Sequence, residues 1–253
     1  MKQLSILIFL ILIFSTKAFS QINSLPPDSL DAPIMQEIFQ TTKNLQQRYQ
    51  ALEMKERVAF RLAAVVPSRE LRANQNLDFR QYADYQVLVQ DGQLVERKLL
   101  ETHNNRHFGM ANLVKQIDIF AIQETIPSFA SLQTAALFFI NRENVSGYKE
   151  LEREDIDHHR AIKFEIRFHQ DKIAIYDCEL WIDEKSREPL RAKVRFGDID
   201  RYQNVTLLIN YKHDKSLQLS AIEQEISCAT FERGLPIRLE HTVTYSDLKF
   251  TAK

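Results

Sequence analysis

Four successive segments in the C-terminal half of the chain alternate apolar and polar residues. Apolar side chains take nearly every second position in Ile162–Phe168, Ala174–Ile182, Leu190–Phe196 and Val205–Tyr211. Successive side chains of a strand point to opposite faces, so each segment is predicted to be a strand with one apolar and one polar side. Joined in order, the four strands would form an antiparallel sheet whose large apolar face other parts of the chain must cover.

The same alternation predicts further strands on both sides of this core. One runs from Val58 to Pro67, a second from Leu77 to the turn Asp91-Gly92, and a third from Leu94 to about Thr102. The dipeptide Asp-Gly between apolar alternations is a strong hairpin signal. The last strand is expected over residues 237–250, and the total is roughly ten, a size at which open sheets curl or split.

Two regions change to helical spacing. Apolar residues from Met35 to Leu52 recur every three or four positions, which predicts one amphipathic helix over 34–53 with Asp31 as N-cap and Pro33 in its first turn. Residues 110–123 and 128–140 are apolar with the same spacing, and Ser128 is the expected N-cap of the second segment. This insertion is too apolar to lie in water and is expected to cover the sheet as a lid over 108–140.

The expected fold is therefore α+β. We predict one domain over residues 31–253, in which a strongly curved antiparallel sheet of about ten strands wraps the N-terminal helix. Residues 21–30 contain Pro26 and Pro27 with little apolar material and are interpreted as a tether.

The N-terminus is typical of an export signal. Lys2 is followed by an apolar run from Leu4 to Phe14 and by small residues at Ala18 and Ser20, which predicts a signal peptide over 1–20 cleaved after Ser20. The alternative is a membrane anchor, but the apolar run is shorter than the roughly 18–20 residues that span a bilayer. A periplasmic, monomeric protein is expected.

Composition excludes several classes of function. The 33 Lys and Arg residues nearly balance the 34 Asp and Glu residues, so no charge field attracts nucleic acid or acidic headgroups. The five glycines argue against a glycine-rich phosphate loop. Cys178 and Cys228, the two cysteines, could pair if their strands were neighbours, or remain buried thiols.

No set of residues marks an active site. His103 and His107 are four apart, but the segment is expected to leave a strand for a loop, and no Glu follows His103 as a helical metalloprotease motif requires. His158 and His159 are adjacent and would point apart. The chain contains neither G-x-S-x-G nor H-E-x-x-H. We expect no catalytic residue, no metal and no cofactor.

Acidic pairs are interpreted as solvated surface. Glu152 and Glu154, like Glu223 and Glu225, are two residues apart on one side of a strand, where paired carboxylates could do acid–base work in a cleft. Their alternation with neighbours such as Arg153 and Ile226 favours an outer face in water.

The order of the elements resembles the periplasmic outer-membrane lipoprotein-sorting (LolA/LolB-like) carrier superfamily. The most similar stretch is 161–196, where AIKFEIRF leads to a strand ending in W-I-D, a short polar turn and a Pro-Leu-Arg opening of the next strand; the closing TVTYSDLKF is also similar. The resemblance implies an unclosed β-barrel, or half-barrel, that holds acyl chains against helices. Residues 77–89 lack the arginine-proline start of the sorting carriers proper, so a broader lipid- or lipopeptide-binding role is expected.

The leading hypothesis is a carrier that shelters the acyl chains of a lipid or lipoprotein in a hydrophobic cavity, since carriers favour curved sheets with adjustable mouths. A filled core without a cavity is the alternative. The cavity would be lined by inward residues of the alternating strands: Val58, Phe60, Leu62, Tyr85, Val87, Ile166, Phe168, Tyr176, Leu180, Val194, Leu207 and Ile209. The lid would close it with Phe129, Leu132, Phe138 and Phe139.

Two other functions stay open. A filled core would suit a module that binds another envelope protein through a sheet edge or its outer face. A hydrolase would need a polar triad in the cavity, for which His103, His107 and His241 are the candidates and His241 alone is expected to face inward.

Overall fold

One antiparallel sheet organises the protein. The computed structural model describes residues 30–67, 74–104, 131–199, 202–214, 218–232 and 235–250. Ten strands lie in the order β3-β2-β1-β10-β9-β8-β7-β6-β5-β4. Their bounds are β1 (Ala51–Pro67), β2 (Asn74–Gln90), β3 (Gln93–Asn104), β4 (Val145–Ile156), β5 (His159–Phe168), β6 (Ile175–Asp183), β7 (Pro189–Phe196), β8 (Gln203–His213), β9 (Leu219–Glu232) and β10 (Leu235–Phe250).

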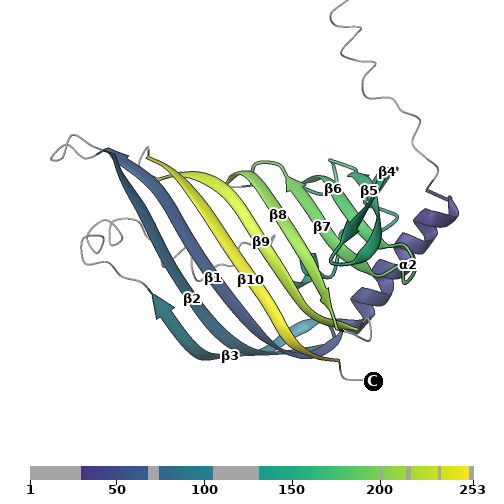
Figure 1. The fold of residues 1–253 in the computed structure, drawn as a ribbon, viewed down its shortest axis with the longest axis horizontal. Coiled ribbons are helices and arrows are strands. Elements are labelled where there is room, and N and C mark those ends of the chain that lie inside the picture. The colour runs from purple at the N-terminus through teal and green to yellow at the C-terminus, as the bar shows by residue number, and fades with distance from the viewer. Residues whose placement is uncertain are drawn as a thin grey trace, which may run out of the picture.

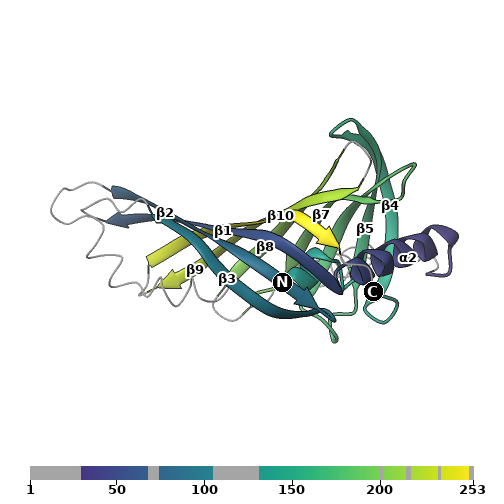
Figure 2. The same ribbon diagram turned by 90° about the horizontal axis from the view of Figure 1, so that it is seen from below.

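The sheet is a curved half-barrel that the described residues do not close. Strands that follow one another in sequence pair with each other, except β3 and β4, and β1 also pairs with β10, so that the first and last strands are neighbours in the sheet. β3 and β4 form the two edges. Helix α2 (Pro33–Arg48) lies beside β4 and β5 at one end of the sheet, while β1, β2 and β3 extend away from it (Figures 1 and 2). The predicted fold class is confirmed.

α2 buries one apolar stripe against the sheet. Met35, Ile38 and Leu45 are almost completely buried, as the helical spacing of these residues requires. The N-cap is Ala32 without a side-chain cap, so the prediction of Asp31 was wrong; Asp31 instead pairs with Arg142 at 2.5 Å.

The predicted end of the helix near residue 53 was also wrong. α2 ends at Arg48 and β1 begins at Ala51. Leu52 fits the helical spacing, but it also begins the period-two series Leu52, Met54, Glu56, which pairs with β2 and is buried. Leu52 fits both the helical and the strand pattern, and its pairing with Val89 of β2 places it in the strand.

Side-chain contacts tie α2 to two connecting segments. Thr42 Oγ1 and Gln46 Nε2 donate to the carbonyl oxygens of Ile140 (3.4 Å) and Leu137 (3.3 Å). At the C-terminal end of α2, Arg48 pairs with Glu188 of the β6–β7 turn at 3.0 Å. The helix is thereby fixed to the half of the sheet that contains β4–β9.

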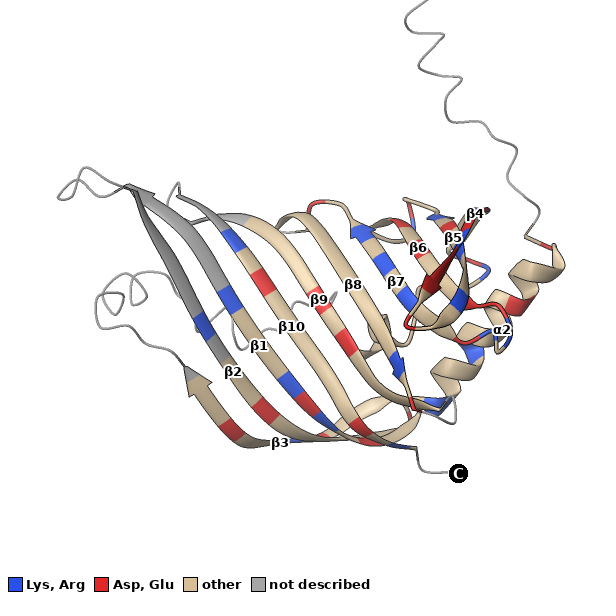
Figure 3. Ribbon diagram, in the orientation of Figure 1, with Lys and Arg blue, Asp and Glu red and all other residues tan. Residues whose placement is uncertain are grey.

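The strands alternate as predicted, with an apolar inner face and a charged outer face. The inner residues Phe164, Val194 and Leu207 have no exposed surface. Charged residues recur along the strands in Figure 3, and outer-face neighbours form ion pairs, such as Arg57 with Asp84.

The hairpin predicted at Asp91-Gly92 is confirmed. Both residues have positive φ (50° and 73°), the geometry of a tight two-residue hairpin turn. Asp157 and His158 form the same kind of turn between β4 and β5, with φ of 47° and 72°.

Most of the expected lid, including the helix predicted over 110–123 and the N-cap Ser128, lies outside the described residues. From residue 131 onward, the helix is only α5 (Leu132–Ala135), and Ser131 is its N-cap. A helix continuing to 140 was wrong: Leu137 has φ 57°, a left-handed conformation that ends helical geometry. Neither α2 nor α5, the helices of the described ranges, has the length and apolar content that a membrane crossing requires.

Candidate ligand-binding site

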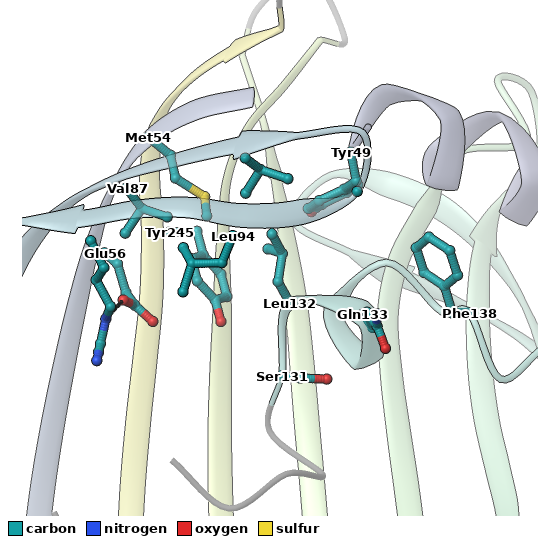
Figure 4. A pocket seen from close by; sticks show the side chains of 13 residues that line it. Tyr49, Met54, Glu56, Val87, Leu94, Ser131, Leu132, Gln133, Phe138 and Tyr245 are labelled. Carbon is teal, nitrogen blue, oxygen red and sulfur yellow. Dashed lines mark hydrogen bonds and ion pairs between the residues drawn. The ribbon is translucent and has the colours of Figure 1, made fainter. Parts of the chain in front are cut away.

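A pocket of about 400 Å³ lies between the inner face of β1–β3 and the segment that contains α5. In Figure 4, Met54, Val87 and Glu56 lie on one side, and Ser131, Leu132, Gln133 and Phe138 come from the opposite segment. Its lining is Tyr49, Met54, Glu56, Val87, Val89, Gly92, Leu94, Arg97, Ser131, Leu132, Gln133, Phe138 and Tyr245.

The sheet wall of this pocket follows from strand register. Met54 pairs with Val87 and Leu52 with Val89, so these side chains project from the same face of β1 and β2. Val87 and Val89 are each 2% exposed. The wall is therefore apolar and continuous across two strands, a suitable surface for a hydrocarbon chain.

One end of the pocket carries an ion pair in otherwise apolar surroundings. Glu56 is 5% exposed, and Arg97 Nε lies 2.7 Å from its Oε2. The Arg97 guanidinium also stacks on the Tyr85 ring, with Cζ 3.7 Å from the centroid. Burial raises the pKa of the Glu56 carboxyl above its usual range, and Arg97 offsets part of that shift.

The segment opposite the sheet is capped at the N-terminal end of α5 and hydrogen-bonded to β8 at the C-terminal end. The Thr134 backbone N–H donates to Ser131 Oγ, and Tyr211 Oη, from β8, donates to the Ala135 carbonyl oxygen at 2.8 Å. Phe139 packs edge-on against Phe168 of β5 with centroids 5.6 Å apart. These contacts hold Leu132 and Phe138 over the pocket.

The predicted cavity residues separate into two groups. Ile166, Phe168, Leu180, Val194, Leu207 and Ile209 are at most 4% exposed and pack in the core beneath α2, and none of them lines this pocket. Val87 lines it, whereas Val58, Phe60 and Tyr85 lie on the same inner face without lining it. The side chain of Leu62 lies outside the described residues.

Tyr176 does not face inward as predicted and is 57% exposed. The β6–β7 register shifts between Ile175 and Asp177, which places Ile175 rather than Tyr176 on the buried face. Such a bulge reverses the alternation locally. The Tyr176 ring instead covers Gly197, where a Cβ would lie 3.1 Å from the ring.

Two of the four predicted lid residues, Leu132 and Phe138, line the pocket. Phe139 packs on the core, and Phe129 lies outside the described residues.

Sequence reasoning missed most of the pocket, including Tyr49, Met54, Glu56, Arg97 and Tyr245. A usable signal existed at Glu56: it stands two residues before Val58, in the inward register, where a carboxylate is unexpected. A charge in that register predicts a partner of opposite charge, which is Arg97.

The two candidate histidines that the structure describes, His103 and His241, lie in different environments. His241 faces inward as expected, is 4% exposed and packs edge-on against Phe60 at 4.8 Å. Burial lowers the pKa of His241 to about 4. His103 is exposed and stacks on Tyr82, and His107 lies outside the described residues. Within the described ranges, no cluster of three or more His, Cys, Asp or Glu residues could hold a metal ion.

The acidic residues Glu152 and Glu154 have partners on other strands, and the two cysteines are not bonded to each other. Lys163 pairs with Glu152 at 3.6 Å, and Glu154 accepts a hydrogen bond from Trp181 Nε1; the Glu152 side chain is 64% exposed, as predicted for an outer face in water. Cys178 and Cys228 are buried free thiols. Their strands, β6 and β9, are separated by β7 and β8, a gap of about 14 Å at the usual strand spacing, which is too far for a disulfide.

No protein-family model and no curated protein matches the chain. Among solved structures, the fold is similar to a LolA superfamily protein from Nitrosomonas europaea, with 12% identity, coverage of 84% of this chain and 94% of that one, and a TM-score of 0.33. It is also similar to a putative outer membrane lipoprotein-sorting protein domain from Vibrio parahaemolyticus, with a TM-score of 0.37, and to a DUF1329 family protein from Desulfovibrio piger, with a TM-score of 0.30. Each of these two is 10% identical to this chain, and each similarity covers 85% of this chain and 92% of the other. The names of the first two structures belong to the superfamily that the sequence resembles.

Proposed function

We propose that the protein is an exported carrier or binding protein that shelters the acyl chains of a lipid or lipoprotein in the pocket between β1–β3 and α5. The observation that best supports this function is a pocket of about 400 Å³ with an apolar wall on the inner face of the sheet. Each methylene removed from water contributes about 0.8 kcal/mol, so one long chain supplies useful affinity. The chemistry is binding without turnover, because no nucleophile, base and orienting group meet among the described residues of this site.

The test combines extraction with a matched pair of variants. Organic extraction and native mass spectrometry of freshly purified protein should recover a bound lipid, and a dansyl-labelled fatty acid should bind. Leu132→Trp fills the pocket and should weaken binding about tenfold or more. Leu151→Trp, at an exposed site on β4, should leave it unchanged. No extracted lipid, no fatty-acid binding and equal behaviour of both variants would refute the carrier.

Export is part of this proposal. Protein from its native host should begin at or near Gln21, and intact Met1 in the cytoplasmic fraction would contradict export.

A protein-binding module is the second candidate, and edge strand β3 favours it. Leu94, Val95, Leu99 and Leu100 are each more than half exposed. An apolar strand edge can pair with a strand of another protein. Co-purification with one stoichiometric protein, without extractable lipid, would favour this function over the carrier.

A further inference from the structure

The inner face of β9 and β10 contains two buried polar side chains whose hydrogen-bonding groups are unused. Gln224 is 0% exposed, and neither its Oε1 nor its Nε2 has a partner in the structure as described. His241 is 4% exposed, and its Nε2 has none either. A buried polar group without a partner destabilises a folded protein, so two such residues on one face require an explanation.

Strand register makes the two side chains neighbours. Gln224 pairs with Val243, and His241 pairs with Ile226, two residues farther along β9. They are therefore diagonal cross-strand neighbours, roughly 7–8 Å apart at the backbone, within reach of a common ligand group. The flanking residues in the same rows are apolar: Val58 and Ile209 on the Gln224 row, Phe60 and Leu207 on the His241 row.

The pair lies on the same face as the pocket. Tyr245, which lines the pocket, pairs with Ile222, two residues before Gln224. At about 3.4 Å per residue, Gln224 lies roughly 7 Å beyond the Tyr245 row and His241 roughly 14 Å. A chain that enters the pocket and continues along β9 and β10 would meet both side chains.

The two groups suit a neutral partner. The Gln224 amide donates and accepts, and a neutral imidazole can do either at Nε2. Burial holds the pKa of His241 near 4, so neither group carries charge at neutral pH. A carboxylate or phosphate would lose its hydration here without gaining an opposite charge, whereas a carbonyl gains hydrogen bonds at little desolvation cost.

We infer that Gln224 and His241 form a recognition site for an ester or amide carbonyl within an otherwise apolar ligand. This inference rests on the proposed carrier function and adds a specificity to it. The ligand class is a neutral acyl ester or acyl amide rather than a free fatty acid or a plain hydrocarbon. The carbonyl oxygen accepts from Gln224 Nε2 or His241 Nε2, and an amide N–H can donate to Gln224 Oε1.

The test compares chains that differ only at the carbonyl. Methyl myristate, N-methylmyristamide and tetradecyl methyl ether, which lacks the carbonyl, compete with a dansyl-labelled tetradecyl chain, a probe without a carboxylate, on full-length protein. Gln224→Met and His241→Phe keep the shape and remove the polar atoms. Each variant should bind the ester and amide about tenfold more weakly and bind the ether as the wild type does. A stronger effect on the amide than on the ester in Gln224→Met identifies an amide ligand.

A second measurement separates recognition from folding. Without ligand, both variants should unfold at a higher temperature than the wild type, because an unsatisfied buried group is removed. Ile226→Leu, which conserves volume beside His241, is the control and should change neither the unfolding temperature nor the affinity for the three chains. The carbonyl site is overturned if both variants unfold at a lower temperature than the wild type, or if they lose equal affinity for the ester and the ether. A wild type that binds none of the three chains overturns the carrier as well, whereas equal binding of all three overturns the carbonyl site alone.

Discussion

The two halves of the sheet have the same alternating sequence and different interiors. In the half formed by β4–β9, inner residues such as Phe164 and Leu180 are at most 1% exposed beneath α2. In the half formed by β1–β3, Leu94 and Leu99 are more than half exposed, and the inner face includes an ion pair and a pocket. Alternation determines which face a side chain takes, and the covering elements determine whether that face becomes core or binding surface.

The interior of the sheet differs in packing between the two halves. The half that α2 covers is a packed core, and the half beside β3 keeps a space of about 400 Å³. The packed half can hold the geometry of the other half, where the proposed ligand would bind.

The largest difference between the halves should appear on truncating an inner residue. Phe164→Ala removes a fully buried ring from the covered half and should lower the free energy of unfolding by about 3–5 kcal/mol. Leu99→Ala, at a site 53% exposed, should cost no more than about 1 kcal/mol. Urea denaturation of both variants measures the difference, and equal losses would show that the two halves are equally buried.

Removing the cation at the end of the pocket should give the next largest effect. Arg97→Met leaves the Glu56 carboxylate buried without its partner and should cost about 2–4 kcal/mol near neutral pH, somewhat below the cost for a fully buried pair because Arg97 is partly exposed. Loss of Arg97 also removes the group that lowers the pKa of Glu56, so this pKa rises further.

The sign of the pH dependence follows from that shift. A carboxyl with a raised pKa in the folded state stabilises the fold when protonated, and this stability is lost as the pH rises through the folded-state value. The deficit of Arg97→Met should therefore shrink as the pH falls from neutral toward the ordinary Glu value of 4.5. A deficit that is constant over this range would mean that Glu56 is not the origin of the cost.

At the inner face between the halves, an additional effect of His241 should appear only in acid. The folded state holds His241 neutral with a pKa of about 4, whereas the unfolded chain takes up the proton near 6.5. The unfolded state thus binds more protons between these values, and the wild type loses stability as the pH falls through them. His241→Phe lacks this loss and should gain on the wild type by up to roughly 3 kcal/mol between pH 6.5 and 4.

The comparison requires denaturation curves over a pH series. Ile226→Leu, opposite His241, is the control because it introduces no titrating group and should track the wild type at every pH. A gain for His241→Phe that is the same at pH 8 and pH 4 would assign the effect to packing instead of protonation.

Sequence alone predicted the architecture because alternation is a local property. The strand face of Phe164, the hairpin at Asp91-Gly92 and the inward orientation of His241 each depend on a few neighbouring residues. The prediction of where α2 ends was wrong because Leu52 fits both the helical and the strand period. The prediction that Tyr176 faces inward was wrong because a bulge shifts the register by one residue.

The pocket was harder to predict because it depends on contacts between distant segments. Glu56 and Arg97 are 41 residues apart, and the segment around Leu132 reaches the pocket through a hydrogen bond from Tyr211, 76 residues away from Ala135. Periodicity identifies the inward residues of each strand, but it does not say which of them α2 covers. The residues chosen from alternation therefore included both the core and part of the pocket wall.

The outer faces of the two halves should behave alike, and this is the smallest expected effect. Arg57 and Asp84 form an ion pair outside β1 and β2, and Arg195 and Asp177 form one outside β6 and β7, each with Nε 2.7 Å from a carboxylate oxygen. Both arginine side chains are about half exposed, so water screens both pairs. Arg57→Met and Arg195→Met should each cost less than about 1 kcal/mol, and both costs should diminish in about 1 M salt. If Arg195→Met cost several kcal/mol while Arg57→Met cost none, the outer face would also distinguish the halves. Equal small costs would confine their difference to the inner face, where α2 covers one half and the pocket occupies the other.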